Sequence, residues 1–182
     1  EVDAIDEVVR AFEDDNVIHV NGKVDPTSDT ATIDIELAMA DLSTVEKRVE
    51  TLTKQKRAGL DKQQTTELAL VERLQAHLAD GKPVRDFSLT PDEALIIKSL
   101  NLLTSKPLLY ILNVSESQVA TAKPETYNLP PDRTVVIAVK VEQELAALEP
   151  ADAKVYLNEL GLRASGLDRL IQAAYRALGL LT

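Results

Sequence analysis

Two short apolar runs in the second half of the chain restrict its fold more than any other feature. Residues 108–112 read LLYIL and residues 134–139 read TVVIAV, and neither alternates between apolar and polar side chains. Such continuous runs are typical of strands that are covered on both faces in a parallel sheet. Residues 4–12 are a third candidate strand, although Asp6 and Glu7 interrupt its apolar residues. The pattern predicts an α/β fold that contains a parallel sheet.

A strongly periodic segment follows the first candidate strand. Pro26 disfavours helix at the residue before it, and the Ser, Asp and Thr residues at 27–30 can cap the next helix. Apolar residues then recur in steps of three and four, with charged residues at the outer positions, as in a coiled-coil seam. The seam residues are Ile35, Ala38, Leu42, Val45, Val49 and Leu52. We therefore expect a long helix in this segment.

A second helix, from about residue 63 to residue 79, completes a predicted helical hairpin. Its residues Val71, Leu74 and Leu78 share one face. The connecting stretch KQKRAGLDK combines dense charge with Gly59, which suits the exposed tip of a hairpin. A GKP sequence then ends the second helix.

A shorter helix leads from the hairpin to the strand at 108–112. Thr90, Pro91 and Glu93 form a helix start signal, with Thr90 as the N-cap and Glu93 reaching back to it. Lys106 and Pro107 end this third helical region.

The last third of the chain alternates between strand and helix. Residues 142–148 and 151–160 read as helices, and Ser165 opens a final helix. The predicted buried stripe of this final helix is Leu167, Leu170, Ile171, Ala174 and Leu178. In parallel α/β sheets, ligands bind at the carboxyl ends of the strands, so we expect functional residues there.

Composition narrows the class of function. The 182 residues suffice for one domain with an insertion, and 30 acids against 20 bases give a net charge of −10. This charge argues against non-specific coating of nucleic acid or anionic lipid, while it leaves room for a local basic patch. There is no cysteine, no apolar run of membrane-spanning length, and an acidic N-terminus. We expect a cytoplasmic protein that does not bind membranes.

The run at 108–112 ends in Asn113, and Glu116 follows three positions later. One interpretation of the sequence NVSE is a turn that leads into the next helix. The alternative is a base-binding motif, since GTP-binding proteins carry N-K-x-D at this place and its aspartate accepts two N–H groups of guanine. Here Val114 replaces the lysine and Glu116 replaces the aspartate. One added methylene displaces the carboxylate, which predicts relaxed or adenine preference.

Several separate blocks of sequence together resemble the YchF family, the Obg-like ATPases of the translation-factor class of P-loop NTPases. The blocks are VVRAFEDDNVIHVNGKVDPTSD, IELAMADLSTVEKR, LNLLTSKPLLYILNVSE and ELGLRASGLDRLIQAAYRALGLLT. They occur in one order and extend over essentially the whole chain. The resemblance implies a nucleotide-binding α/β domain, interrupted by a helical coiled-coil insertion, with a preference for ATP over GTP and an association with the ribosome.

The resemblance also assigns residues to the base-binding site. Asn113 and Glu116 match the altered base-reading motif of the family, with Val114 and Ser115 as its variable middle. The second base-side loop corresponds to Ala138, Val139 and Lys140. Ala138 departs from the family pattern because it lacks a hydroxyl group, so this loop is expected to act through its backbone N–H groups and the stem of Lys140.

The phosphate-binding half of such a site has no counterpart in the sequence. A P-loop needs two glycines followed by a Lys-Ser or Lys-Thr pair, and the chain contains no such motif. We expect the P-loop, the switch segments and the C-terminal domain of the family to lie outside these residues, and ATP and Mg²⁺ to be cofactors of the longer protein. No catalytic or metal-binding residue, no bound cofactor and no ATPase activity are expected within the 182 residues.

The resemblance divides the chain into three segments. Residues 1–27 and 106–182 would belong to the nucleotide-binding domain, and residues 28–105 would form the helical insertion. Without its central strand the sheet would have an exposed edge, through which copies could associate, whereas the longer protein is expected to be monomeric.

A basic cluster lies at the predicted hairpin tip. Lys54, Lys56, Arg57 and Lys62 can form a solvated turn, or they can contact the phosphates of ribosomal RNA. A second function class is therefore an interaction module, in which the hairpin binds the ribosome or another protein and the sheet only supports it.

Three other features have structural interpretations that compete with functional ones. His19 lies in a second extended pattern at 17–23, where a histidine is usually structural rather than catalytic. His77 is expected to be solvated. The acids Glu13, Asp14 and Asp15 can bind Mg²⁺, but a turn with three acids is usually just exposed to water.

Overall fold

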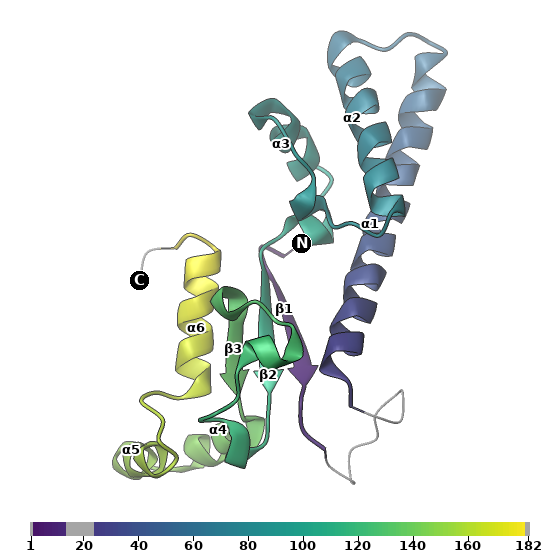
Figure 1. Cartoon of the computed structure of the whole chain (residues 1–182). Coiled ribbons are helices and arrows are strands. Elements are labelled where there is room, and N and C mark those ends of the chain that lie inside the picture. The colour runs from purple at the N-terminus through teal and green to yellow at the C-terminus, as the bar shows by residue number, and fades with distance from the viewer. Residues whose placement is uncertain (1, 14–23, 181–182) are drawn as a thin grey trace. The chain divides into compact units, whose positions relative to one another are not determined.

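The computed structural model describes residues 2–13 and 24–180, and its sheet has three parallel strands in the order β1–β2–β3 (Figure 1). The strands are β1 (Ile5–Arg10), β2 (Leu108–Asn113) and β3 (Thr134–Ile137). The predicted α/β fold with a parallel sheet is confirmed. The extended pattern at 17–23, His19, Asp14 and Asp15 lie outside the described residues.

The central strand β2 is buried on both faces, as its continuous apolar sequence predicts. Leu108, Tyr110 and Leu112 belong to one hydrophobic cluster, and Leu109 and Ile111 belong to another. Successive side chains of a strand point to opposite faces, so one short run contributes to two cores.

The strand β1 lies at an edge of the described sheet. Glu7 pairs in register with Tyr110 and is 7% exposed, whereas Asp6 pairs with Leu109 and is exposed. Val8, on the same face as Asp6, is also exposed at 63%. The two neighbouring acids therefore point to opposite faces of the sheet, and the described residues cover only the face of β1 that carries Glu7.

Helix α6 (Gly166–Ala177) packs beside β2 and β3 (Figure 1). The inward residues are Leu170, Ala173, Ala174 and Ala177, so the predicted stripe was wrong in part. Leu167, Ile171 and Leu178 are exposed because the helix is turned so that its alanines approach the sheet. One nitrogen of the Arg169 guanidinium donates to the carbonyl oxygen of Val136 at 2.8 Å. Arg169 therefore satisfies a backbone carbonyl of β3 that would otherwise be free to pair with another strand.

The strand β3 is shorter than the predicted run at 134–139. It ends at Ile137, and α4 (Val139–Ala147) starts immediately, with Ala138 as its N-cap residue. The N–H group of Glu142 donates to the carbonyl oxygen of Ala138 at 3.1 Å, which begins the helical hydrogen bonding. Helix α5 (Pro150–Glu159) follows, with Pro150 in its first turn.

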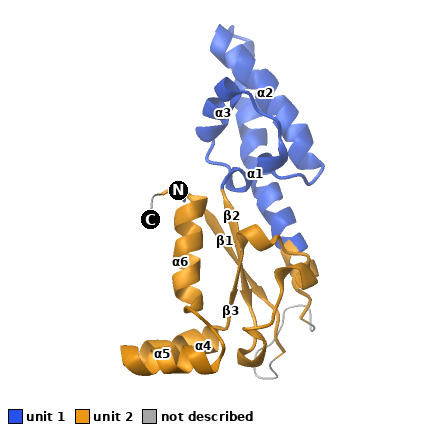
Figure 2. Ribbon diagram, turned by 60° about the vertical axis from the view of Figure 1, so that its left-hand side comes forward, with its two compact units in different colours: residues 1–2, 31–106 blue, residues 3–30, 107–182 orange. Residues whose placement is uncertain are grey.

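Residues 31–106, together with residues 1–2, form one compact unit, and residues 3–30 and 107–182 form the other (Figure 2). The first unit contains α2 (Lys62–Ala79) and all of α1 (Pro26–Lys56) except residues 26–30, and the two helices form a hairpin. Its core includes Ala38, Val45, Leu52, Val71, Leu74 and Leu78, with Leu42 and Val49 packed against them. Five of the six predicted seam residues therefore pack in this core, whereas Ile35 is 54% exposed.

The ends of the hairpin helices follow from local sequence. Helix α1 starts at Pro26, and the Oδ1 atom of Asp25 accepts the N–H group of Ser28 at 3.1 Å. Asp25 therefore caps α1, and the expectation that the residues after Pro26 would do so was wrong. Gly59 has a φ of +98° in the turn, a conformation that favours glycine. Asp61 then starts α2 with a capping box that includes Gln64.

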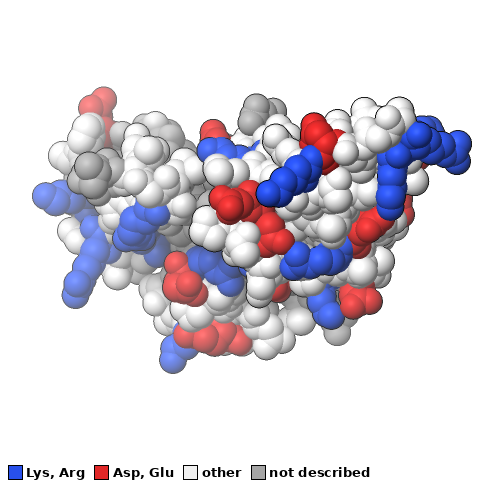
Figure 3. All heavy atoms as spheres, turned by 90° about the horizontal axis from the view of Figure 1, so that it is seen from above, with Lys and Arg blue, Asp and Glu red and all other residues white. Residues whose placement is uncertain are grey.

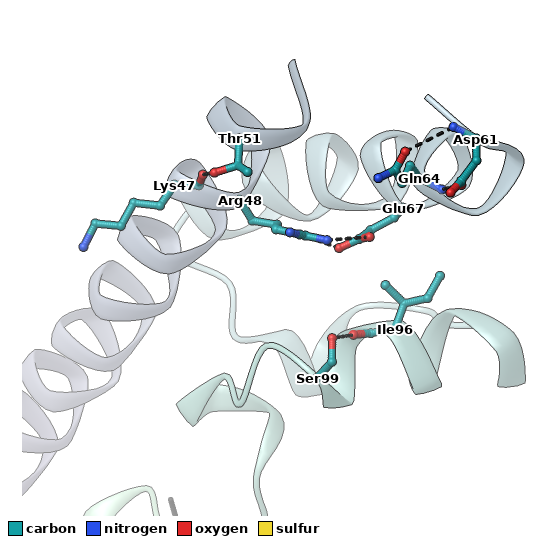
Figure 4. Close-up of polar contacts among 8 residues, drawn as sticks. All are labelled: Lys47, Arg48, Thr51, Asp61, Gln64, Glu67, Ile96 and Ser99. Carbon is teal, nitrogen blue, oxygen red and sulfur yellow. Dashed lines mark hydrogen bonds and ion pairs between the residues drawn. The ribbon is translucent and has the colours of Figure 1, made fainter. Parts of the chain in front are cut away.

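An ion pair joins the two hairpin helices (Figure 4). The Nε and Nη2 atoms of Arg48 donate to the two carboxylate oxygens of Glu67 at 2.6 Å and 2.8 Å. The hydrogen bond to Glu67 raises the pKa of Arg48. This bidentate geometry fixes the rotation of one helix against the other.

The segment after the hairpin is held by a buried carboxylate on α1. Asp41 is 2% exposed, and it accepts the N–H groups of Leu103 and Thr104, both at 2.7 Å. The Thr104 hydroxyl also donates to Asp41 at 2.6 Å and accepts the N–H group of Val84 at 2.9 Å. Three segments of this unit thus meet in one hydrogen-bond network.

Helix α3 (Pro91–Lys98) starts as predicted, with a capping box formed by Thr90 and Glu93. His77 is not simply solvated: its Nε2 atom lies 2.9 Å from the carbonyl oxygen of Pro83, and its ring contacts Phe87 edge to face. Across the described parts of the chain, every helix is too short or too polar to cross a lipid bilayer.

Candidate nucleotide-base site

A cavity of about 800 Å³ lies at the carboxyl ends of the three strands. It is lined by Phe12, Glu13, Asn113, Val114, Ser115, Glu116, Ser117, Val139, Lys140, Gln143 and Leu160. Its volume falls in the range of roughly 300–1,000 Å³ that is usual for small-molecule sites. The cavity is therefore at the place where parallel α/β proteins bind ligands.

Asn113 joins two walls of this cavity. It is the last residue of β2, and its Oδ1 atom accepts the N–H group of Val139, the first residue of α4, at 3.2 Å. The backbone N–H group of Val114 also donates to the carbonyl oxygen of Ile137 at 2.9 Å. These two bonds hold the segment after β2 against the segment after β3.

Glu116 is the first residue of a short 3-10 helix, Glu116–Gln118, and it is half-buried. The hydroxyl and N–H groups of Ser115 both donate to the side-chain oxygen of Gln118, which fixes the start of this turn. The Tyr156 hydroxyl lies 3.4 Å from the Oε1 atom of Glu116 and also donates to Glu144. The hydrogen bond to Glu144 raises the pKa of Tyr156 to about 12.

The structure brings five of the six expected base-side residues to one cavity: Asn113, Val114, Glu116, Val139 and Lys140. Ala138 is 1% exposed and belongs to the neighbouring hydrophobic cluster instead. The small, apolar side chain of Ala138 is compatible with this buried N-cap position, because it has no polar atom that needs a hydrogen-bond partner.

The sequence argument did not find Phe12, Gln143 or Leu160 in the cavity wall. Phe12 could have been found, because it follows β1 at the same edge of the parallel sheet as Asn113. The Arg10 guanidinium lies over the Phe12 ring, 4.8 Å from its centre. Leu160 comes from the end of α5, and no local sequence signal indicated that α5 reaches this site.

The wall suits a planar ligand with N–H donors. Glu116 supplies a carboxylate acceptor, Asn113 an amide, and Phe12, Val139 and Leu160 apolar surface. Among the described residues that line it, Lys140 is the one cation, which does not suffice for a triphosphate. Nowhere in residues 2–13 and 24–180 do three or more acidic or histidine side chains cluster in a way that could hold a metal ion. The chemistry of the described lining is thus compatible with a planar base.

The four cations of the predicted tip, Lys54, Lys56, Arg57 and Lys62, are in the other compact unit, and all are exposed. Lys54 forms an ion pair with Glu50 one turn earlier in α1. Basic and acidic side chains are intermixed on the face seen in Figure 3. The tip therefore presents accessible positive charge, of which part is neutralised locally.

The sheet, the cavity at the strand ends and the helical hairpin define a P-loop NTPase-type α/β protein with a helical insertion. A solved structure entitled "Structure of the Schizosaccharomyces pombe YchF GTPase" superposes on this fold with a TM-score of 0.83 at 33% identity. The superposition covers 97% of this chain and 50% of that chain.

Comparison with curated proteins identifies named relatives that the chain resembles. The chain is 45% identical to "Ribosome-binding ATPase YchF" of Bacillus subtilis (strain 168) and 39% identical to the protein of the same name from Haemophilus ducreyi. Each match covers 100% of this chain, and 52% and 51% of those relatives, respectively. No protein-family model matches the chain. The resemblance to the YchF family is confirmed, and the chain spans about half the length of the curated relatives it matches.

Proposed function

We propose that these residues supply the base-binding side of the nucleotide site, together with a helical arm, in a ribosome-associated YchF-type ATPase of the cytoplasm. The observation that carries the proposal is the placement of Asn113 and Glu116 in one cavity, with Asn113 bonded to the N–H group of Val139. The relatives named ribosome-binding ATPases support the ribosome as partner.

In this proposal, residues 1–27 and 106–182 form the nucleotide-binding domain and residues 28–105 form the inserted arm. The two compact units support this division, although their boundaries at 30/31 and 106/107 differ from it by a few residues. The longer protein is proposed to be monomeric. Arg169 reduces the tendency of β3 to pair with another copy, because it already occupies the carbonyl group of Val136.

The proposed base preference is adenine over guanine. Guanine presents two adjacent N–H donors, which need both oxygens of a correctly placed carboxylate, and Glu116 is one methylene longer than the aspartate that performs this task. Val114, Ala138, Val139 and Lys140 complete the base site, through backbone groups and the Lys140 stem. ATP hydrolysis needs the phosphate loop and Mg²⁺, so we propose that the 182 residues alone do not hydrolyse ATP.

Asn113→Ala in the full-length protein tests the proposed site. We expect the Kd for ATP to rise about tenfold, because the amide no longer holds the start of α4 and a polar contact is lost from the cavity. Titration with a fluorescent ATP analogue measures this. The matched control is Asn158→Ala, which removes an exposed asparagine from α5 and should leave the Kd unchanged. An unchanged Kd in Asn113→Ala would contradict the base site.

The second candidate function, an interaction module, rests on the four exposed cations at the hairpin tip. Replacing Lys54, Lys56, Arg57 and Lys62 by Glu should reduce ribosome co-sedimentation of the full-length protein by about tenfold or more, with a shallower salt dependence. The control is the same reversal at four exposed cations of the other unit: Lys123, Lys154, Arg163 and Arg176. If the tip variant co-sediments with ribosomes as well as the control variant and the unmodified protein do, the tip is not the contact.

A further inference from the structure

The Tyr156 hydroxyl lies between two carboxylates at the rim of the base cavity. It lies 3.4 Å from the Oε1 atom of Glu116, and it donates a short hydrogen bond to Glu144. Glu116 lines the cavity, whereas Tyr156 and Glu144 are not part of the described lining. Tyr156 therefore contacts Glu116 from outside the ligand space.

Two features keep this hydroxyl in place. The Tyr156 ring packs against the hydrophobic cluster that contains Leu112, Val114 and Val141, so its position is set by the core. The bond to Glu144 raises the pKa of Tyr156 to about 12, so the phenol stays protonated at neutral pH. A phenol has a single proton to donate, and its oxygen occupies space next to Glu116 whichever carboxylate receives that proton.

This arrangement bears on how Glu116 can bind a base. A guanine edge with two N–H donors needs both carboxylate oxygens, but the Tyr156 hydroxyl stands against Oε1. The single exocyclic amino group of adenine needs only one oxygen, and Oε2 is left for it. A ligand that leaves a polar group without a hydrogen-bond partner is rejected more strongly than a ligand that merely fits an apolar pocket poorly.

We propose that Tyr156 is a specificity-determining positioning residue, whose hydroxyl occupies the space beside one oxygen of Glu116 and thereby disfavours guanine nucleotides, which need both oxygens. This inference rests on the proposed base site, and it assigns part of the base preference to α5, outside both base-side loops.

The test compares ATP and GTP binding by the full-length protein and its Tyr156→Phe variant, in competition against a fluorescent nucleotide. Phe keeps the ring that packs against the core and removes only the hydroxyl. We expect the ratio of GTP Kd to ATP Kd to fall about fivefold, mainly because GTP binds more tightly, which corresponds to one ordinary hydrogen bond. Tyr175→Phe makes the same chemical change on the exposed side of α6 and should leave the ratio unchanged.

The outcomes separate this inference from the proposed site. If the wild-type protein binds neither nucleotide, the base site itself is wrong. If it binds ATP but the ratio stays constant in Tyr156→Phe, or both affinities change by one factor, Tyr156 has only a structural role and the inference is overturned. Glu144→Gln provides a second variant, because it keeps an oxygen for the phenol. In Glu144→Gln the ratio of GTP Kd to ATP Kd should not fall. A fall equal to that of Tyr156→Phe would also overturn the inference.

Discussion

Asp41→Ala is expected to lower the free energy of unfolding of the helical unit by about 3 kcal/mol. The substitution removes the acceptor of two backbone N–H groups, at Leu103 and Thr104, and of the Thr104 hydroxyl. Each buried donor that loses its partner costs about 1–3 kcal/mol, and water that enters the vacated space recovers part of the sum. The measurement is chemical denaturation followed by circular dichroism, together with hydrogen exchange at residues 103 and 104.

The matched control is Asp34→Ala on the same helix. Asp34 pairs with Arg85 at 3.2 Å, and its side chain is 40% exposed, so its loss should cost less than about 1 kcal/mol. If both variants are equally stable, or if residues 103 and 104 remain protected in Asp41→Ala, the network does not hold this segment.

Gly166→Ala is expected to destabilise the sheet unit by about 2 kcal/mol, although alanine is the better helix former. An added Cβ would lie 2.8 Å from the Cγ1 atom of Ile137 and 2.8 Å from the Oε1 atom of Glu142. Glu142 accepts the N–H groups of Gly166 and Leu167, so its displacement also removes two hydrogen bonds from the start of α6 and leaves only the cap by Ser165. The helix propensity gain of at most about 1 kcal/mol is smaller than the combined cost of crowding and lost bonds.

Thermal unfolding and hydrogen exchange at residue 167 test this prediction. Gly161→Ala is the control: an added Cβ there meets no atom within 4 Å, and the cost is limited to the backbone strain of a φ of +72°. Residue 167 should lose its protection only in Gly166→Ala. A stabilised Gly166→Ala variant would show that the structure relaxes around the methyl group.

The parts of the fold that depend on local sequence could be predicted. The continuous run at 108–112 predicted a strand buried on both faces, and Thr90 with Glu93 predicted the start of α3. Errors arose where packing partners decide the result. Ile35 has the spacing of the hairpin seam but is exposed, and the rotation of α6 is set by the close approach of its alanines to the sheet.

In the candidate site, too, some residues could be predicted from the sequence and others depend on packing. Asn113 and Glu116 could be placed at the cavity because a parallel sheet brings the carboxyl ends of its strands together. Tyr156 follows 40 residues after Glu116, and nothing in its neighbouring sequence indicates that its hydroxyl reaches this carboxylate. Its position depends on how α5 packs against the core, which one sequence does not specify by pattern alone.

The strand β2 is paired on both sides, along its whole length with β1 and at Tyr110, Ile111, Leu112 and Asn113 with β3. Adding or deleting one residue within it would exchange the side chains of its two faces and displace Asn113 from Val139. Over evolution, changes of chain length should thus be excluded from β2. They should accumulate in connections such as residues 120–128, which come after the base-side residues and lie between the buried Val119 and Leu129.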